Sequence, residues 1–244
     1  MTSAPSPSPI DQRTTTPRLL LLSLAAGSLD ALSYVRLGHV FVAFMTGNTV
    51  LLGISLGQLD TPHAIRAATT LLGFCAGVAL GAVVTAPGGP RPTRWPARLT
   101  AVIAIETALL TTAALLWTLA TPDRIPVPTL LVTLALAAGL QSVGVQRLGI
   151  PFVSTTFITG TLTSAVSRLV MLLLPGATTG GARPSRRGLA LPIAVFVVYG
   201  AGAAVGGLGS LRVGAHVIWV PVAAAALVLC VDVAIMVADR RRAA

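Results

Sequence analysis

The sequence has few charged residues and no lysine. Charged residues make up 10% of its 244 residues, all 17 basic residues are arginine, and only seven residues are acidic. A soluble domain carries roughly 25% charged residues, so this composition excludes an ordinary soluble protein. The two cysteines, Cys75 and Cys230, lie in separate apolar stretches, which excludes a disulfide framework and gives no pattern for a metal site. No stretch shows the alternation that a membrane β-barrel requires.

Long apolar stretches dominate what is present. Hydrophobic residues make up 54% of the chain, and the mean hydropathy is +0.85. A helix needs about 20 mainly apolar residues to cross a bilayer, and in lipid only a helix satisfies its own backbone within one segment. The sequence therefore predicts an all-α, polytopic protein of the inner or plasma membrane, with the lipid bilayer as its first partner. The six predicted spans are 18–34, 67–85, 99–120, 129–145, 189–208 and 213–237.

Two further apolar segments, 40–57 and 152–174, are interrupted by polar and small residues. The first reads Thr46-Gly47-Asn48-Thr49 in its middle. Glycine and asparagine favour backbone angles that break a helix. The freed backbone groups would cost several kcal/mol each in lipid unless protein or water meets them. One interpretation is a broken or re-entrant helix that lines a polar cavity. The other is that these small residues only allow close helix packing.

Two stretches of the chain resemble each other. "AAGSLDALSYVRLGHVFVAFMTGNT" begins at Ala25, and "AAGLQSVGVQRLGIPFVSTTFITGTLT" begins at Ala137, with four short matches offset by 111 to 113 residues. Matches in the same order, at the same place relative to a span, indicate a duplication. The predicted organisation is a transmembrane domain at 18–238, with repeats at 18–120 and 128–238. A disordered tail at 1–17 and a basic tail at 239–244 flank it.

The distribution of arginine decides between six and eight spans. If the broken segments do not cross, 13 of the 17 arginines fall on the side of the two termini; if they cross, only 11 do. The positive-inside rule therefore predicts six spans with both termini cytoplasmic. Three crossings per repeat is an odd number, so the second repeat would be inverted relative to the first. The arginine clusters beside the spans then have a topological role, and no nucleic-acid partner is expected.

The first stretch also resembles a known family. "AGSLDALSYVRLGHVFVAFMTGNTVLLG" is similar to the opening of the YoaK family of bacterial membrane proteins (domain of unknown function 1275). That family pairs an acidic residue in its first helix with a downstream Met-Thr-Gly-Asn, here Asp30 and Met45 through Asn48. The resemblance extends from about Arg18 to the C-terminus and implies the same span layout, but it implies no activity. The second stretch departs from the pattern, because it has Thr161 in place of the asparagine.

Ionisable residues within apolar segments mark the second element of the predicted site. A carboxylate in the membrane costs about 2.5 kcal/mol or more, so it normally faces a cavity or a partner. Asp30 and Glu106 lie inside spans, and Arg168 lies in the second broken segment; pairing of Arg168 with either acid would give that pair a packing role instead. Asp232 is close enough to the end of its span to snorkel. The predicted substrate- or ion-binding residues are Asp30, Thr46, Gly47, Asn48, Thr49, Glu106, Thr159, Gly160, Thr161 and Arg168.

The predicted function is transport. We expect a small-solute or ion transporter or channel with a polar site at the two broken segments. The alternative is a non-transporting membrane module that assembles as a homo-oligomer or binds a partner. No combination of nucleophile and base is recognisable, so no enzymatic activity, cofactor or metal is expected.

Overall fold

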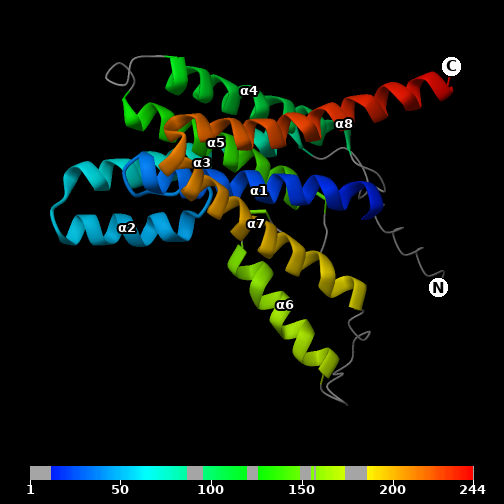
Figure 1. Ribbon diagram of the computed structural model, residues 1–244, viewed down its shortest axis with the longest axis horizontal. Coiled ribbons are helices and arrows are strands. Elements are labelled where there is room, and N and C mark those ends of the chain that lie inside the picture. Colours follow the sequence, from blue (N-terminus) through cyan, green and yellow to red (C-terminus); the bar gives the residue numbers. More distant parts are fainter. Residues whose placement is uncertain are drawn as a thin grey trace.

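Helices make up nearly all of the chain that the structure describes (Figure 1). This computed structural model describes residues 12–86, 96–119, 126–148, 155–156, 158–173 and 186–243. The α-helices are α1 (Gln12–Arg36), α2 (Met45–Gly57), α3 (Thr61–Val84), α4 (Ala97–Leu119), α5 (Val127–Gln146), α6 (Ile158–Leu173), α7 (Arg186–Arg212) and α8 (Trp219–Ala243), and a 3-10 turn, η1 (Gly214–Ile218), precedes α8.

Six of these helices are long and apolar enough to cross a membrane, which confirms the predicted all-α fold and its six spans. They are α1, α3, α4, α5, α7 and α8. Helix α3 starts at Thr61, earlier than the predicted 67, because Asp60 caps it: Oδ1 of Asp60 accepts the backbone N–H of His63 at 3.2 Å. This backbone hydrogen bond lowers the pKa of the Asp60 carboxyl. Helix α1 starts at Gln12, and residues 1–11 of the predicted tail lie outside the described chain.

The segment between α1 and α3, residues 37–60, starts and ends at the same end of the bundle. Gly38, two residues after the end of α1, lies against the side chain of Arg66 in the first turns of α3. The rings of His39 and His63 stack with their centroids 6.4 Å apart. The end of α1 is therefore beside the start of α3, and the segment that joins them leaves and returns on one side.

Between these two ends the segment reaches back along α1. The backbone N–H groups of Ala43 and Phe44, just before α2, donate to Asp30, which lies inside α1 rather than at its end. Helix α2 then runs back beside α3, as Figure 1 shows, and ends at Gly57. The first broken segment is thus a re-entrant loop and half-helix, and α2 does not add a crossing.

Helices α1 and α7 approach so closely that only glycine fits at their crossing. A Cβ on Gly27 of α1 would fall on the backbone carbonyl of Tyr199 in α7. A Cβ on Gly202 of α7 would fall on the carbonyl of Leu24 in α1. Small residues that let two backbones approach are the usual means of packing helices in a membrane, where no hydrophobic driving force between helices remains.

Helices α3 and α5 make the same kind of crossing. A Cβ on Gly77 of α3 would fall on the carbonyl of Leu136 in α5, and one on Gly139 of α5 would fall on the carbonyl of Phe74 in α3. These two glycine crossings hold four of the six spans in pairs. The remaining spans, α4 and α8, pack on each other and on α5 and α1 respectively.

A buried ion pair joins α1 to α8. Nε of Arg18 donates to Oδ1 of Asp232 at 2.5 Å, and the hydroxyl of Thr100 in α4 donates to Oδ2 of Asp232 at 3.2 Å. The expectation that Asp232 snorkels to the surface was wrong: the residue is 2% exposed, because Arg18 supplies a counter-charge inside the bundle. The pair also places the start of α1 and the end of α8 at one end of the bundle, on the right in Figure 1.

Candidate functional site

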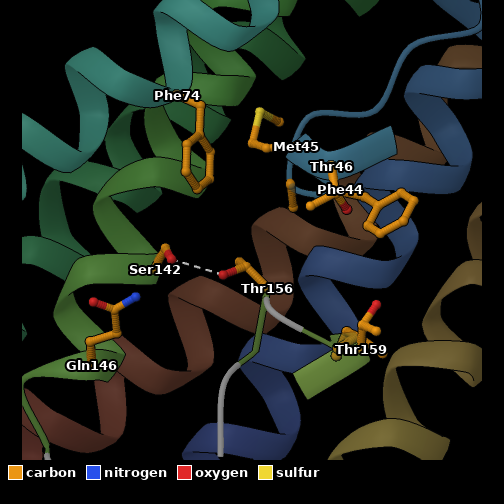
Figure 2. Close-up of a pocket in the computed structure, with 10 residues that line it drawn as sticks. Phe44, Met45, Thr46, Phe74, Ser142, Gln146, Thr156 and Thr159 are labelled. Carbon is orange, nitrogen blue, oxygen red and sulfur yellow. Dashed lines mark hydrogen bonds between the residues drawn. The ribbon is translucent and has the colours of Figure 1, made fainter. Parts of the chain in front are cut away.

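A pocket of about 210 Å³ lies where the two broken segments meet. The loop before α2 and the start of α2 form one wall, and Thr156 with the first residues of α6 forms another (Figure 2). Helices α3 and α5 complete it. The lining residues are Ala43, Phe44, Met45, Thr46, Phe74, Ser142, Gln146, Thr156, Ile158 and Thr159.

The α5 side of the pocket is fixed by hydrogen bonds. The hydroxyl of Thr156 donates to Oγ of Ser142 at 2.9 Å, the dashed line in Figure 2. One residue earlier, Nε2 of Gln141 donates to Oγ1 of Thr155 at 2.8 Å and to the carbonyl oxygen of Leu22 in α1 at 3.1 Å. These bonds attach Thr155 and Thr156 of the second broken segment to α5 and, through Gln141, to α1.

Asp30 bonds the backbone of the wall formed by the loop before α2, on the side away from the pocket. Its Oδ1 accepts the N–H of Ala43 at 2.7 Å and that of Phe44 at 3.3 Å, and its Oδ2 accepts the hydroxyl of Tyr199 at 2.5 Å. Both carboxylate oxygens are therefore occupied by the protein itself. The backbone N–H groups of Ala43 and Phe44, which have no helical partner, are bonded by this side chain, and this removes the free-energy cost of leaving them unpaired in lipid. Asp30 is 3% exposed and is not among the residues that line the pocket.

The polar residues of the first break have different roles. Asn48 turns back on its own loop: its Oδ1 accepts the N–H of Phe41 at 2.8 Å, and its Nδ2 donates to the carbonyl of Phe41 at 2.5 Å. Gly47 lies against the rings of Phe41 and Phe44, where a Cβ would clash. The hydroxyl of Thr49 donates to the carbonyl of Met45 within α2. Asn48, Gly47 and Thr49 therefore shape the loop, and Thr46 reaches the pocket.

The remaining predicted site residues are spread over the second half and α4. Thr159 lines the pocket opposite Thr46, as the sequence predicted for the two breaks. Gly160 and the buried Thr161 follow it in the first turn of α6 but are not lining residues, and Arg168 lies further along α6. Glu106 lies in α4 with 1% exposure, away from the pocket lining.

The alternative that Arg168 pairs with Asp30 or Glu106 finds no such bond among the described residues. In the described part of the chain, the partners of Asp30 are Tyr199, Ala43 and Phe44, and Oε2 of Glu106 has no hydrogen-bond partner. For Asp30 the reason is that both carboxylate oxygens already accept hydrogen bonds, from the backbone N–H groups of Ala43 and Phe44 and from the hydroxyl of Tyr199.

Several residues of the site were missed from the sequence alone. Phe74, Ser142, Gln146, Thr156 and Tyr199 carry no charge at neutral pH, so their presence in an apolar segment does not mark them as costly in a membrane. One signal existed. Ser142 lies five residues after Ala137, just as Asp30 lies five residues after Ala25, so the two similar stretches already placed them at matching positions.

Comparison with known proteins confirms the family resemblance. The family model described as "Protein of unknown function (DUF1275)" matches residues 18–231, most of the chain. This chain belongs to the DUF1275 family. The UPF0700 transmembrane protein YoaK of Bacillus subtilis (strain 168) is 37% identical to this DUF1275 member over 146 residues. The match covers 60% of the chain and 63% of that relative, which is less than two thirds of its length. No solved structure matches the chain.

Proposed function

We propose that this DUF1275 member carries a small solute or ion across the cell membrane, as a transporter or channel, and that the pocket is its binding site. The observation that supports this most is the position of the pocket. It lies between two broken segments, and the first of them is re-entrant. Non-helical backbone inside a membrane is tolerated where it is buried in protein or lines a cavity, and transporters place their sites at such breaks.

The proposal includes two inverted repeats. If α1 and α3 correspond to α5 and α7, the α1–α7 crossing corresponds to the α5–α3 crossing, and both use glycine at matching positions. The chain crosses with α1, α3 and α4 before α5 starts, so α1 and α5 run in opposite directions. An inverted pair of this kind offers two related conformations, one open to each side of the membrane.

The proposed transporter has a defined orientation in the membrane and no enzymatic role. Both termini and the loop between α3 and α4 face the cytoplasm, because this arrangement puts most of the arginines inside. The chain is assigned no enzymatic role and no cofactor.

One observation favours the alternative of a non-transporting module that assembles with itself. Gly200 and Gly207 of α7 face open space, whereas Gly202 and Gly206 on the same helix are used against α1. An open small-residue face can receive a helix of a second copy. The pocket has no role in this alternative, which gives the two proposals different consequences for pocket variants.

Flux through proteoliposomes tests the proposal. Purified protein would be reconstituted and screened by light scattering for entry of glycerol, urea and larger neutral solutes, and by electrical or dye assays for ions. Thr159→Leu places an apolar side chain at the pocket and should abolish the flux. Thr163→Leu, the same change at an exposed position of α6 that does not line the pocket, is the control and should retain it. Absence of any flux, or equal flux in both variants, would count against the proposal.

A further inference from the structure

We infer that the pocket selects an electrically neutral solute of about the size of one ring, which it holds through hydroxyl and amide hydrogen bonds and an aromatic face. This inference rests on the proposed function and names the chemical class of its substrate. Four observations carry it: the side chains that line the pocket, the bonds that already occupy the carboxylate of Asp30, the volume of the pocket, and the difference between the α1–α7 and α5–α3 crossings.

The lining contains no ionisable side chain. Its polar groups are three threonines, one serine and one glutamine, and the rest is apolar or aromatic. Arg147, beside the lining residue Gln146, is exposed and is not among the lining residues.

The nearest carboxylate has other partners. Ala43, Phe44 and Tyr199 use both oxygens of Asp30, so Asp30 positions the wall and does not offer a free oxygen to a cation. The other buried acids of the described chain, Glu106 in α4 and Asp232 in α8, lie outside the lining. A charged solute would give up its hydration on entry and find no opposite charge in return, whereas a neutral solute gives up much less.

The lining offers hydrogen bonds to a neutral solute. Hydroxyls of Thr46 and Thr159 and the amide of Gln146 lie at the exposed parts of the pocket, and they can both donate and accept. Phe74 points from α3 toward Ser142 and Thr156, as Figure 2 shows, and gives an apolar face. A site of this kind suits a molecule with an amide or hydroxyl group on a small apolar body.

The volume limits the size of the solute. An engineered cavity of about 150 Å³ in another protein holds benzene. By proportion, the 210 Å³ of this pocket would hold a molecule of roughly eight non-hydrogen atoms. This is well below the size of a nucleotide, a disaccharide or a lipid.

A comparison of the two glycine crossings explains why the pocket is uncharged. Ser142 follows Gly139 by three residues, as Asp30 follows Gly27, and Phe74 takes at the α5–α3 crossing the place that Tyr199 has at the α1–α7 crossing. At the α1–α7 crossing the acid and the phenol bond each other. At the α5–α3 crossing both are replaced by groups without charge, and the space beside them is the pocket.

Thiol reactivity tests the charge preference without knowledge of the natural solute. Ser142→Cys would be made in the full chain lacking Cys75 and Cys230, purified in detergent, and treated with three methanethiosulfonates of similar length: 2-hydroxyethyl (neutral), 2-sulfonatoethyl (anionic) and 2-(trimethylammonium)ethyl (cationic). Each rate is divided by the rate with a free thiol in solution. Thr46→Cys, on the opposite wall, is the second variant in case Ser142→Cys does not fold. Thr49→Cys, exposed on α2 and outside the lining, is the control.

We expect the relative rate at the pocket thiol to be at least tenfold lower for both charged reagents than for the neutral one, with no such difference at Thr49→Cys. A charged reagent that reacts at the pocket as fast as the neutral one would overturn the inference and leave the proposed function standing. If no reagent reaches either pocket thiol while Thr49→Cys reacts with all three, the pocket is closed to solutes and the proposed function itself fails.

Discussion

The phenol of Tyr199 donates a 2.5 Å hydrogen bond to Oδ2 of Asp30, and Oδ1 of the same carboxylate accepts two backbone N–H groups of the first re-entrant loop. One side chain in α1 thus connects α7 to a wall of the pocket. The connection runs through a glycine crossing, where the backbones of α1 and α7 are too close for other residues.

Two substitutions of Asp30 should show whether its hydrogen bonds or its negative charge stabilises the fold. Asn at position 30 keeps an acceptor for the N–H groups of Ala43 and Phe44, so Asp30→Asn should fold. Asp30→Ala leaves those two donors and the Tyr199 hydroxyl unpaired, at a cost of about 1–3 kcal/mol per buried group. Thermal unfolding in detergent should show a far lower Tm for the alanine variant. Equal Tm values would show that these bonds contribute nothing to the fold.

The α5–α3 crossing can be given the acid–phenol pair of the α1–α7 crossing. Ser142→Asp alone buries a carboxylate without its phenol and should destabilise the protein. Adding Phe74→Tyr should recover about 1.5–3 kcal/mol, the usual range for a hydrogen bond to a charged group. The double variant should fold and lose solute flux, because the new pair occupies the pocket. The two single variants and the double variant form a double-mutant cycle, and a coupling of zero would contradict the correspondence between the two glycine crossings.

Two neighbouring glycines of α7 should respond differently to alanine. A Cβ on Gly202 would meet the carbonyl of Leu24, so Gly202→Ala should force α1 and α7 apart and cost about 1–3 kcal/mol. Gly200 faces open space, so Gly200→Ala should be neutral or should stabilise the helix by up to about 1 kcal/mol. Yield of folded protein and Tm by size-exclusion and thermal assays would measure both. A larger effect at Gly200 would identify that face as an interface between copies.

The Arg18–Asp232 pair should behave as a buried ion pair. Its side chains are 4% and 1% exposed, so Asp232→Asn removes the carboxylate from a buried ion pair and should destabilise the protein by about 3–5 kcal/mol. The double substitution Arg18→Met with Asp232→Leu removes both charges and should recover most of that loss. If the double variant is no more stable than Asp232→Asn, the charge of Arg18 is not the cause.

Labelling of intact cells should establish the orientation. Leu59, in the connection between α2 and α3, is 89% exposed. In a chain without Cys75 and Cys230, Leu59→Cys should react with a membrane-impermeant maleimide added outside. Thr93→Cys should react only after the cells are opened. The reverse pattern is what a crossing α2 would give with the N-terminus inside, and it would sink the six-span arrangement.

The spans and the breaks could be predicted from the sequence because they depend on local composition. Apolar length predicts a crossing, and Thr46-Gly47-Asn48 predicts a break, without knowledge of any neighbour. Partners were harder to predict. Asp232 pairs with Arg18, 214 residues away, and Asp30 bonds Tyr199, 169 residues away. Such choices depend on which helix faces cross.

Only those residues of the pocket that local sequence marks could be predicted. Thr46 and Thr159 were placed at the pocket by their position in the two similar stretches. Glu106 was selected only because an acid in a span is costly, and that cost says nothing about where the side chain points. Ser142 and Phe74 were missed because a serine and a phenylalanine are ordinary residues in any membrane helix.

The pairing of α1 with α7 has a consequence for how the protein is made. Ribosomes deliver α1 to the bilayer first, but the surface that covers Gly27 belongs to a helix that starts only at Arg186. The face of α1 around Gly27 therefore has no helix α7 to pack against until most of the chain has been synthesised. We expect the N-terminal half expressed alone to be degraded by membrane proteases, and to be rescued by co-expression of the C-terminal half as a separate chain.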